Sequence, residues 1–574
     1  MQIALFALGI CGLSVAGWDV VAGGFHFVVF GIRVSSWEAY KPFRIAMGAL
    51  TAAFWLHDRA AEPNRTSWQI LPQWAPWIAG GSAAISVAVA VHFGIFAAGG
   101  ADAYGYVSQA SLWAEGRIVA PDPLASFVPV IGRAVAPLGY VLGRTPSVLV
   151  PVYPPGLPLA MALALEIGGK AAVYYVVPIL GGLAVWLTYL LGARVAGPVS
   201  GMIAAVLLAF SPLFLFHTLE PMSDVPVTAW WLLAWVLALS RGRWTQVGAG
   251  LAVSAAALTR PNLVPLAIVL VVVVAATKPR LSRLALFAAG SIPGCLVVAA
   301  VNAYRYGSPV ASGYGSLESL YAWSHWRENL PRYVGWLIEI NSPVILLAFI
   351  APLVARVRMS IHMLVFFGIL LACYLFYLVF DGWPFLRFLL PALPLLFVLS
   401  SAVIVRGLEL VSSAFRGAAV FLLCVLLPLW YVIKADSLTV FDIQRAEHRY
   451  RAVGETIGRT LPPHAIVMSV IQSGSVRLYS GRMTVRWDML EPARFDEVID
   501  LMWRAGHTPY LLLEDWEAPA FQQRFGTASP YSGLDWPPVI EYKDSSRVRV
   551  YSFADRARHR AGEPIATRFV TYER

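Results

Sequence analysis

Long apolar runs alternate with short polar connections over most of this chain. A helix that crosses a membrane needs about 20 residues at 1.5 Å each, and fewer if it is broken. About thirteen runs approach this length: 2–18, 42–57, 75–98, 170–193, 197–217, 224–240, 246–259, 262–277, 284–303, 342–356, 361–380, 387–405 and 417–434. The pattern predicts a mainly α-helical, polytopic membrane protein.

Two places interrupt this regularity. The runs at 246–259 and 262–277 are short and are separated at Arg260-Pro261, where the proline prevents a continuous helix. The stretch FHFVVFGIRV alternates weakly and has glycine on both sides. It predicts either a short interfacial hairpin or the end of a longer span.

The pattern changes after about Ala435. Helical periodicity over 441–461 and 491–506, with a turn and helix over 473–481, alternates with strand-like segments at 464–471, 482–488 and 508–515 and a hairpin within 539–553. No glycine loop with dinucleotide-binding spacing occurs there. Residues 436–574, the C-terminal segment, are therefore predicted to form a small α/β domain with its own core.

The first long polar interruption runs from Ala101 to Leu157 and opens with ADAYGYVSQASLWAEGR. Its carboxylate Asp102 directly follows an apolar run, although charge is expensive at membrane depth. It closes with LVPVYPPGLP, whose prolines exclude regular helix, before a short interfacial helix. We therefore divide the chain into membrane spans at 1–98, a membrane core at 99–435 whose first loop is 99–169, and the C-terminal segment.

Composition agrees with a membrane protein. The chain is 58% hydrophobic and 13% charged, whereas soluble domains carry about 25% charged residues. Its 21 Trp and 39 Pro fit interfacial aromatic belts and broken helices. The four cysteines all lie in apolar runs, without metal-ligand spacing, and are interpreted as small buried hydrophobic residues.

Charge predicts the orientation. The net charge of +10 lies in the membrane part, because the C-terminal segment holds 18 basic and 18 acidic residues. This excess favours anionic lipid over nucleic acid as a partner. Five alternate connections carry ten Lys/Arg and one acid, which places them in the cytoplasm. Asp102, Glu220, Asp224, Asp381 and the C-terminal segment then face outward.

Asp102 is the first candidate for chemistry. Gly99, Gly100 and Gly105 would let the backbone approach a ligand closely, and Tyr104 offers a ring and a hydroxyl to a sugar or prenyl group. The alternative is structural, since aspartate at the start of AYGYVSQASLWAEGR is a good helix N-cap.

A second group of polar residues lies in HTLEPMSDVPVTAWW. Glu220 and Asp224 are four residues apart, which places both on one face if the segment is helical. Together with His217 they could bind a divalent cation or hydroxyl groups. The alternative is a polar turn in which Asp224 caps the next span.

Several arginines interrupt apolar segments on the same predicted side. Arg260 needs a partner at this depth. Arg305 and Tyr314 belong to VNAYRYGSPVASGYG, and Arg387 begins RFLLPALPLL and suits bidentate phosphate contact. The alternatives for Arg387 are snorkelling to the interface or a local pair with Asp381.

These segments, in this order, resemble the C-type membrane glycosyltransferases (the GT-C superfamily), nearest the bacterial branch of protein O-mannosyltransferases and aminoarabinose transferases. The resemblance rests on ADAYGYVSQA with AEGR, PVYPPGLP, LEPMSDVP, ALTRP, YGSPVASGYG and RFLLPALPLL, over roughly 100–405. No single motif is specific, but the ordered set is. The extra N-terminal spans depart from many members.

The resemblance implies transfer of a sugar from a polyprenyl-phosphate carrier to a glycan, lipid or protein acceptor outside the bacterial cytoplasmic membrane. The first-loop acid of the family corresponds to Asp102, which is expected to act as general base; Ala103 stands where a second acid often occurs. Substrate contacts are expected from Tyr104, Tyr153, Glu220, Asp224, Arg260, Arg305, Tyr314 and Arg387. No cofactor follows with certainty, although a divalent cation is compatible with the carboxylates.

Two other classes of function remain. Intramembrane arginines and acids also serve ion coupling in secondary transporters and lipid flippases. The long outer loops, the lack of an internal repeat and the polar C-terminal segment disfavour that class. A non-catalytic assembly subunit that binds partners through its C-terminal segment is the third interpretation.

Overall fold

The computed structural model describes residues 67–354, 357–409, 413–544 and 546–571, with scattered residues before position 53. The expected spans at 2–18 and 42–57 fall largely outside the described residues. In the glycine-flanked stretch, β1 (Phe25–Val29) and β2 (Ile32–Ser36) pair antiparallel, so the hairpin interpretation is confirmed.

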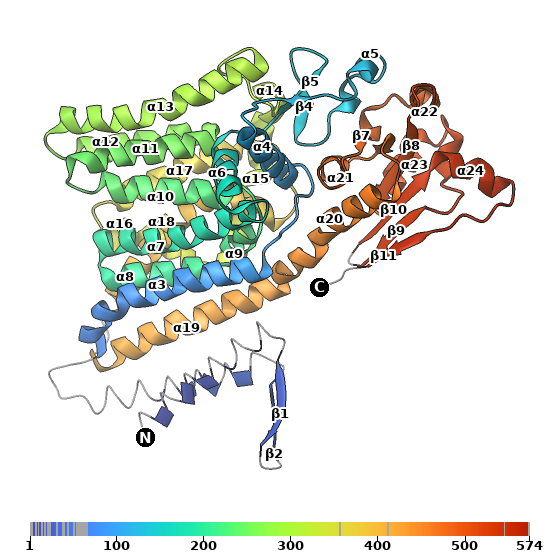
Figure 1. Cartoon of the computed structure of the whole chain (residues 1–574). Coiled ribbons are helices and arrows are strands. Elements are labelled where there is room, and N and C mark those ends of the chain that lie inside the picture. Colours follow the sequence, from blue (N-terminus) through green and yellow to red (C-terminus); the bar gives the residue numbers. More distant parts are fainter. Residues whose placement is uncertain are drawn as a thin grey trace.

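A bundle of apolar helices forms the body of the molecule (Figure 1). Its helices are α3 (Ser67–Phe93), α7 (Val176–Ala196), α8 (Pro198–Phe210), α9 (Pro212–Leu219), α10 (Asp224–Ala238), α11 (Arg243–Thr259), α12 (Ala267–Ala275), α13 (Arg280–Tyr306), α15 (Trp326–Asn341), α16 (Ala351–Val354), α17 (Ser360–Leu375), α18 (Leu393–Leu408) and α19 (Ser413–Ser437). Short 3-10 segments precede α12, α16 and α18.

The expected count of thirteen spans is not confirmed. Within the described residues, five helices are long and apolar enough to cross a membrane, or up to seven if each of two bent pairs is one span. The bends are 57° between α8 and α9 and 111° before the segment 343–354. Five shorter apolar helices have 10 to 17 residues. The helices are interrupted at Ser211 and Arg260, so the apolar sequence around each residue is divided into helices too short to span a membrane.

The most apolar segment lies at the centre of the bundle. The window in Trp383–Leu408 is 89% buried, whereas that in Arg416–Ser437 is 22% buried. A helix that is hydrophobic on all sides is stable where other helices or lipid cover it. Trp231, Trp235 and Phe397 are fully enclosed among these helices.

The first loop folds over one end of the bundle (Figure 1). It contains α4 (Asp102–Ala114), α5 (Val128–Ile131), α6 (Gly156–Gly168) and a small antiparallel sheet of β3 (Ala120–Pro121), β5 (Val148–Pro151) and β4 (Tyr140–Leu142). The helix α6 begins directly after the proline turn, as expected. A later loop carries the single-turn helix α14 (Leu317–Leu320).

The C-terminal segment forms a mixed six-stranded sheet with helices, in the strand order β11-β9-β10-β8-β6-β7. Each element expected over 441–553 is confirmed, and α23, α24 and β11 add to them. The elements are α20 (Ile443–Thr460), β6 (Ala465–Met468), α21 (Ser473–Ser480), β7 (Met483–Val485), α22 (Phe495–Arg504), β8 (Thr508–Glu514), α23 (Ala518–Phe525), β9 (Ile540–Lys543), β10 (Arg547–Ser552), α24 (Phe553–Arg560) and β11 (Arg568–Val570).

One side of this sheet shares its core with the first loop. Leu124, Phe127 and Ile131 are buried in one cluster with Ile466 and Phe495. The backbone N–H of Leu138 also donates to the Ser473 hydroxyl at 3.0 Å. A separate cluster on α20 and the strands forms a second core. The C-terminal segment is therefore not packed on its own, because its first core is completed by the first loop.

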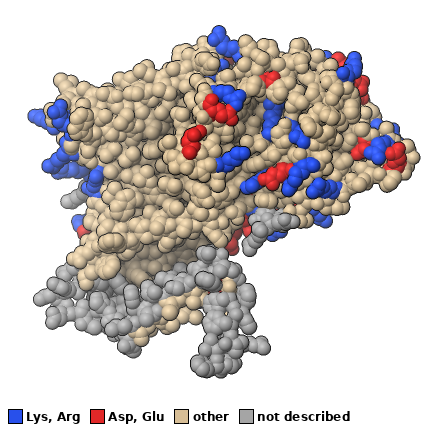
Figure 2. Space-filling model, viewed as in Figure 1, with Lys and Arg blue, Asp and Glu red and all other residues tan. Residues whose placement is uncertain are grey.

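The two ends of the helical body differ in charge. Figure 2 shows a broad, sparsely charged surface over the helical body, with basic side chains gathered at the end away from the C-terminal segment. The α10–α11 and α12–α13 connections lie at that end (Figure 1) and carry Arg241, Arg243, Lys278 and Arg280. The first loop covers the opposite end.

Candidate active site

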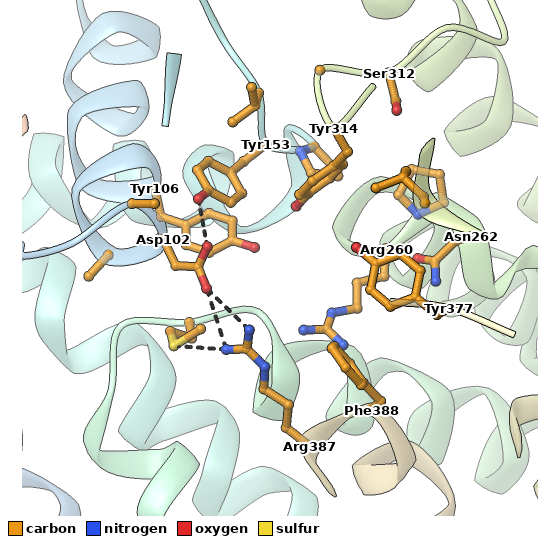
Figure 3. Close-up of a pocket in the computed structure, with 18 of the residues that line it drawn as sticks. Asp102, Tyr106, Tyr153, Arg260, Asn262, Ser312, Tyr314, Tyr377, Arg387 and Phe388 are labelled. Atoms are coloured by element: carbon orange, nitrogen blue, oxygen red, sulfur yellow. Dashed lines mark hydrogen bonds and ion pairs between the residues drawn. The ribbon is translucent and has the colours of Figure 1, made fainter. Parts of the chain in front are cut away.

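A cavity of about 880 Å³ lies where the first loop meets the end of the bundle. Its walls come from segments far apart in the sequence: the start of α4, the proline turn, the α9–α10 connection, the break after α11, the loop before α14 and the 3-10 segment before α18 (Figure 3). The polar lining residues include Asp102, Tyr153, His217, Glu220, Arg260, Asn262, Tyr314, Tyr377, Arg387 and Glu447.

Asp102 is the first residue of α4, but its carboxylate does not cap the helix. The N-cap residue is Ala101, and no side-chain hydrogen bond closes the first turn. The Tyr153 hydroxyl instead donates to Asp102 Oδ1 at 2.6 Å. Arg387 donates to Oδ2 from Nη1 and Nη2 at 3.4 and 3.3 Å. The alternative of a simple cap is wrong, and the 35% exposed carboxylate faces the cavity (Figure 3).

The glycines around Asp102 serve internal packing. A Cβ on Gly99 would lie 2.0 Å from the ring of Tyr450 on α20, and one on Gly105 would lie 2.1 Å from the ring of Tyr153. At Gly99 and Gly105, the chain's own aromatic rings therefore occupy the space that a side chain would need. The expectation that they admit a ligand is replaced by this finding.

Tyr153 places its phenol over Asp102 within a group of rings. Its ring lies 4.6 Å from that of Tyr106 and 5.8 Å from that of Tyr314, centroid to centroid. Burial raises the pKa of Tyr153 well above its ordinary value, and the charge of Asp102 adds to the rise. The phenol therefore stays protonated at neutral pH and donates its hydrogen bond to the carboxylate.

Arg260 fills the break between α11 and the next 3-10 segment. It donates to Asp224 Oδ1 at 2.7 Å and to Ser223 Oγ at 3.0 Å. Its Nη1 lies 3.4 Å from the hydroxyl of Tyr374, which also accepts from Asn262 at 2.9 Å. The arginine thus has the buried acidic partner that its depth requires, since the Asp224 side chain is fully buried.

The connection between α9 and α10 is a turn, so the expected shared helical face is wrong. The helix α9 ends at Leu219 and α10 begins at Asp224, with Glu220 in extended backbone between them. Asp224 does not cap α10 through its side chain. His217 Nδ1 lies 3.2 Å from Glu220 Oε2. Among the described residues no group of three potential metal ligands is found.

Arg387 reaches from the 3-10 segment Trp383–Ala392, which precedes α18, to the first loop. The proposed local pair with Asp381 is not formed, because Asp381 binds Arg332 at 2.6 Å instead. The guanidinium lies over the rings of Phe385 and Phe388, 5.2 and 5.5 Å from their centroids. In the view of Figure 3, Arg387 extends toward Asp102 from below, and Arg260 extends into the cavity from the right. The two guanidinium groups and the Asp102 carboxylate therefore face the same cavity.

Three of the expected substrate contacts do not line this cavity. Asp224 is fully buried beneath it in the ion pair with Arg260. Tyr104 points away from this cavity, packs against Gly474 of the C-terminal segment and lines a separate cavity of about 240 Å³. Arg305 is buried and donates to the backbone oxygens of Tyr153 and Ile118, each at 3.2 Å. Arg305 thus holds the proline turn, whereas Tyr314 does line the main cavity.

Sequence reasoning missed several lining residues. Asn262, Tyr374 and Tyr377 surround Arg260 but lie inside apolar runs, where they resemble ordinary span residues. The Asn262–Tyr374 contact could not be read from the sequence. Glu447 reaches the cavity from α20, and its surface-like helix gave no signal of this role.

Comparisons with known proteins, by sequence and by structure, agree with the fold described above. A sequence profile of the family described as dolichyl-phosphate-mannose-protein mannosyltransferase matches residues 152–304. Comparison with curated proteins found no match.

Two crystal structures of ArnT from Cupriavidus metallidurans share the fold. The structure bound to undecaprenyl phosphate superposes with a TM-score of 0.55 at 12% identity, and covers 82% of this chain and 97% of that chain. The apo structure gives a TM-score of 0.52 at 13% identity with the same coverage. The resemblance to the GT-C superfamily is therefore confirmed at the level of the fold and of a partial sequence match.

Proposed function

We propose that this chain is an integral membrane glycosyltransferase that moves a sugar from a polyprenyl-phosphate carrier to an acceptor hydroxyl. One observation carries the proposal: a single cavity unites the carboxylate of Asp102 with the guanidinium groups of Arg260 and Arg387. The ArnT fold adds support, because a solved relative with this fold holds undecaprenyl phosphate. The acceptor is a glycan, a lipid or a protein.

The two arginines are suited to the phosphate of the donor. Guanidinium groups bind phosphate oxygens in a bidentate manner, and these hydrogen bonds are stronger than neutral ones. Arg387 is now paired with Asp102, so an incoming phosphate would compete for the guanidinium and release the carboxylate. Donor binding would thereby prepare Asp102 for its role in the reaction.

Asp102 then acts as general base. The acceptor oxygen attacks the anomeric carbon while its proton passes to the Asp102 carboxylate. The bond between that carbon and the phosphate oxygen breaks, and the electron pair leaves with polyprenyl phosphate. The transition state resembles an oxocarbenium ion, as in glycoside hydrolysis. No strong acid is required, because phosphate is already a stable anion held by Arg260 and Arg387.

The same proposal assigns the sides of the membrane. The basic connections such as α10–α11 and α12–α13 lie in the cytoplasm, following the positive-inside rule. The cavity, the first loop and the C-terminal segment at 436–574 then lie outside the cytoplasmic membrane, with catalysis in the core at 99–435. A bacterial cell-envelope acceptor fits this placement.

The test compares Asp102→Asn with Asp381→Asn, whose carboxylate is 95% exposed and pairs with Arg332. Each variant is expressed in a host strain that lacks the gene, and envelope glycans, lipids and proteins are analysed by mass spectrometry for the transferred sugar. Losing the general base should slow transfer by about 10²- to 10⁴-fold, with normal accumulation in the membrane. The Asp381 variant should transfer normally. Near-normal transfer by Asp102→Asn would refute the assignment.

A further inference from the structure

The C-terminal segment contributes a carboxylate to the main cavity. Glu447 lies in the second turn of α20 and lines the same cavity as Asp102 and Arg387. Its side chain is 26% exposed, so it is neither a solvated surface group nor an enclosed one. The proposed transfer reaction assigns no role to Glu447.

A buried network fixes the position of Glu447. Arg449 Nη1 binds Glu447 Oε1 at 3.1 Å, and Arg449 Nε donates to Glu514 Oε1 at 2.9 Å. Glu514 ends β8, is 1% exposed and also accepts from Gln472 at 2.9 Å. Because β6 and β8 are parallel neighbours, these groups gather at the carboxyl ends of their strands, where α/β sheets commonly bind ligands.

The same helix is docked on the segment that carries Asp102. Tyr450 packs its ring against Gly99, three residues before Asp102. The Tyr479 hydroxyl on α21 also accepts from the backbone N–H of Ala98 at 2.7 Å. These two contacts therefore link the C-terminal segment, which carries Glu447, to the segment that carries Asp102.

The cavity lining carries charges of both signs. Arg387 lies beside Asp102, whereas Glu447 on α20 lies within electrostatic range of Glu220, and these two carboxylates form an acidic part of the lining. Burial raises the pKa of Glu447 to about 7; Arg449 opposes the rise, and Glu220 and Glu514 add to it. A phosphate anion is repelled from this acidic part. Hydroxyl groups are suited to it, since carboxylates accept their hydrogen bonds.

We propose that Glu447 forms the acceptor subsite, where it accepts hydrogen bonds from the hydroxyl groups of a polyhydroxylated acceptor. This inference rests on the proposed function and makes the C-terminal segment part of the active site. Glu447 orients the acceptor so that its nucleophilic oxygen lies between Asp102 and the donor. The arginines keep the donor phosphate at the other part of the cavity.

The experiment uses the purified full-length chain and, as probe, membranes of a host strain that lacks the gene, which supply donor and acceptor. The variants are Glu447→Gln, Glu447→Asp and the control Glu455→Gln on the same helix, whose carboxylate binds Arg451 at the surface. The rate of sugar transfer is measured as the amount of added membrane is increased. Binding of undecaprenyl phosphate to each purified variant is measured separately by native mass spectrometry.

Glu447→Gln should raise the half-saturating amount of membrane about ten-fold or more, with a maximal rate near wild type, since it loses one charged hydrogen bond. Glu447→Asp should recover part of this loss, and Glu455→Gln should match wild type. Undecaprenyl phosphate binding should be unchanged in all three. An unaltered membrane dependence, or weakened undecaprenyl phosphate binding in Glu447→Gln, would overturn the subsite. Wild-type protein that neither transfers nor binds the lipid would instead overturn the proposed function, and the subsite with it.

Discussion

At the scale of single residues, the surroundings of Asp102 decide between a helix cap and a reacting group. The sequence allowed both roles for Asp102, because an aspartate at the start of a helix can serve either as a cap or as a reacting carboxylate. The deciding contact joins Asp102 to Arg387, 285 residues later. Local sequence contains no information on such a pair, so only the resemblance could place the two residues in one site.

Arg387→Lys tests the guanidinium at this scale. Lysine keeps the charge but loses the bidentate geometry. We expect affinity for undecaprenyl phosphate to fall by roughly ten-fold, as one charged hydrogen bond contributes about 1.5 kcal/mol. Titration of the purified chain with the lipid measures this. Arg332→Lys, which changes the pair with Asp381, serves as control; equal affinities in the two variants would contradict the assignment.

Glu447→Gln should also change stability in a pH-dependent way. The pKa of Glu447 is raised to about 7 in the folded chain, so this partly buried carboxylate destabilises the fold once it ionises. Replacement by Gln should stabilise the chain most above about pH 7, and this gain should shrink as the pH falls and vanish below about 4.5, where the carboxyl is protonated in both the folded and the unfolded state. Thermal unfolding in detergent at about pH 8 and pH 5 measures it. A gain larger at the lower pH would have the wrong sign.

At the scale of elements, local periodicity was a good guide. The α/β pattern of the C-terminal segment predicted α20, β6, α21, β7, α22 and β8 in order, because each is a short amphipathic or buried element. The helix interruption at Arg260 was predicted from Pro261, the residue that follows it. Packing between elements was not predictable: Gly99 was assigned to a ligand, whereas the ring of Tyr450 occupies that space.

Gly99→Ala should disrupt the docking of α20 on the Asp102 segment. The added Cβ would lie 2.0 Å from the Tyr450 ring, so one of the two elements must shift. Transfer should fall by about ten-fold or more, because misplacing a reacting group by about 1 Å is costly. Combining it with Tyr450→Ala should restore part of the rate. Gly335→Ala is the control, since its Cβ would meet nothing within 4 Å.

At the scale of the whole molecule, the C-terminal segment and the first loop form one unit. The sequence predicted separate domains, because apolar periodicity shows which residues are buried but not which segment covers them. The shared cluster of Leu124 and Phe127 with Phe495 joins them. The span count was not confirmed within the described residues for a similar reason, since buried, broken helices need not each reach 20 residues.

Truncation after Ser437 should therefore damage the first loop. Without their partners, Leu124, Phe127 and Ile131 become exposed apolar residues, each losing about 1.5–3 kcal/mol of burial. Limited proteolysis of membranes should cut the truncated chain within 99–169 and leave the full chain intact there. A truncated chain with a protected first loop would show that the two parts fold independently.

The most direct test of the central claim is native mass spectrometry of the full chain purified from its own membranes. A polyprenyl-phosphate carrier in the cavity should appear as a bound mass of a polyprenyl phosphate, with or without a sugar. Asp102→Asn should retain this mass in its sugar-loaded form, and a variant with Arg260→Gln and Arg387→Gln should lose it. Bulk phospholipid alone on the wild-type chain, with no polyprenyl phosphate retained by any variant, would contradict the account.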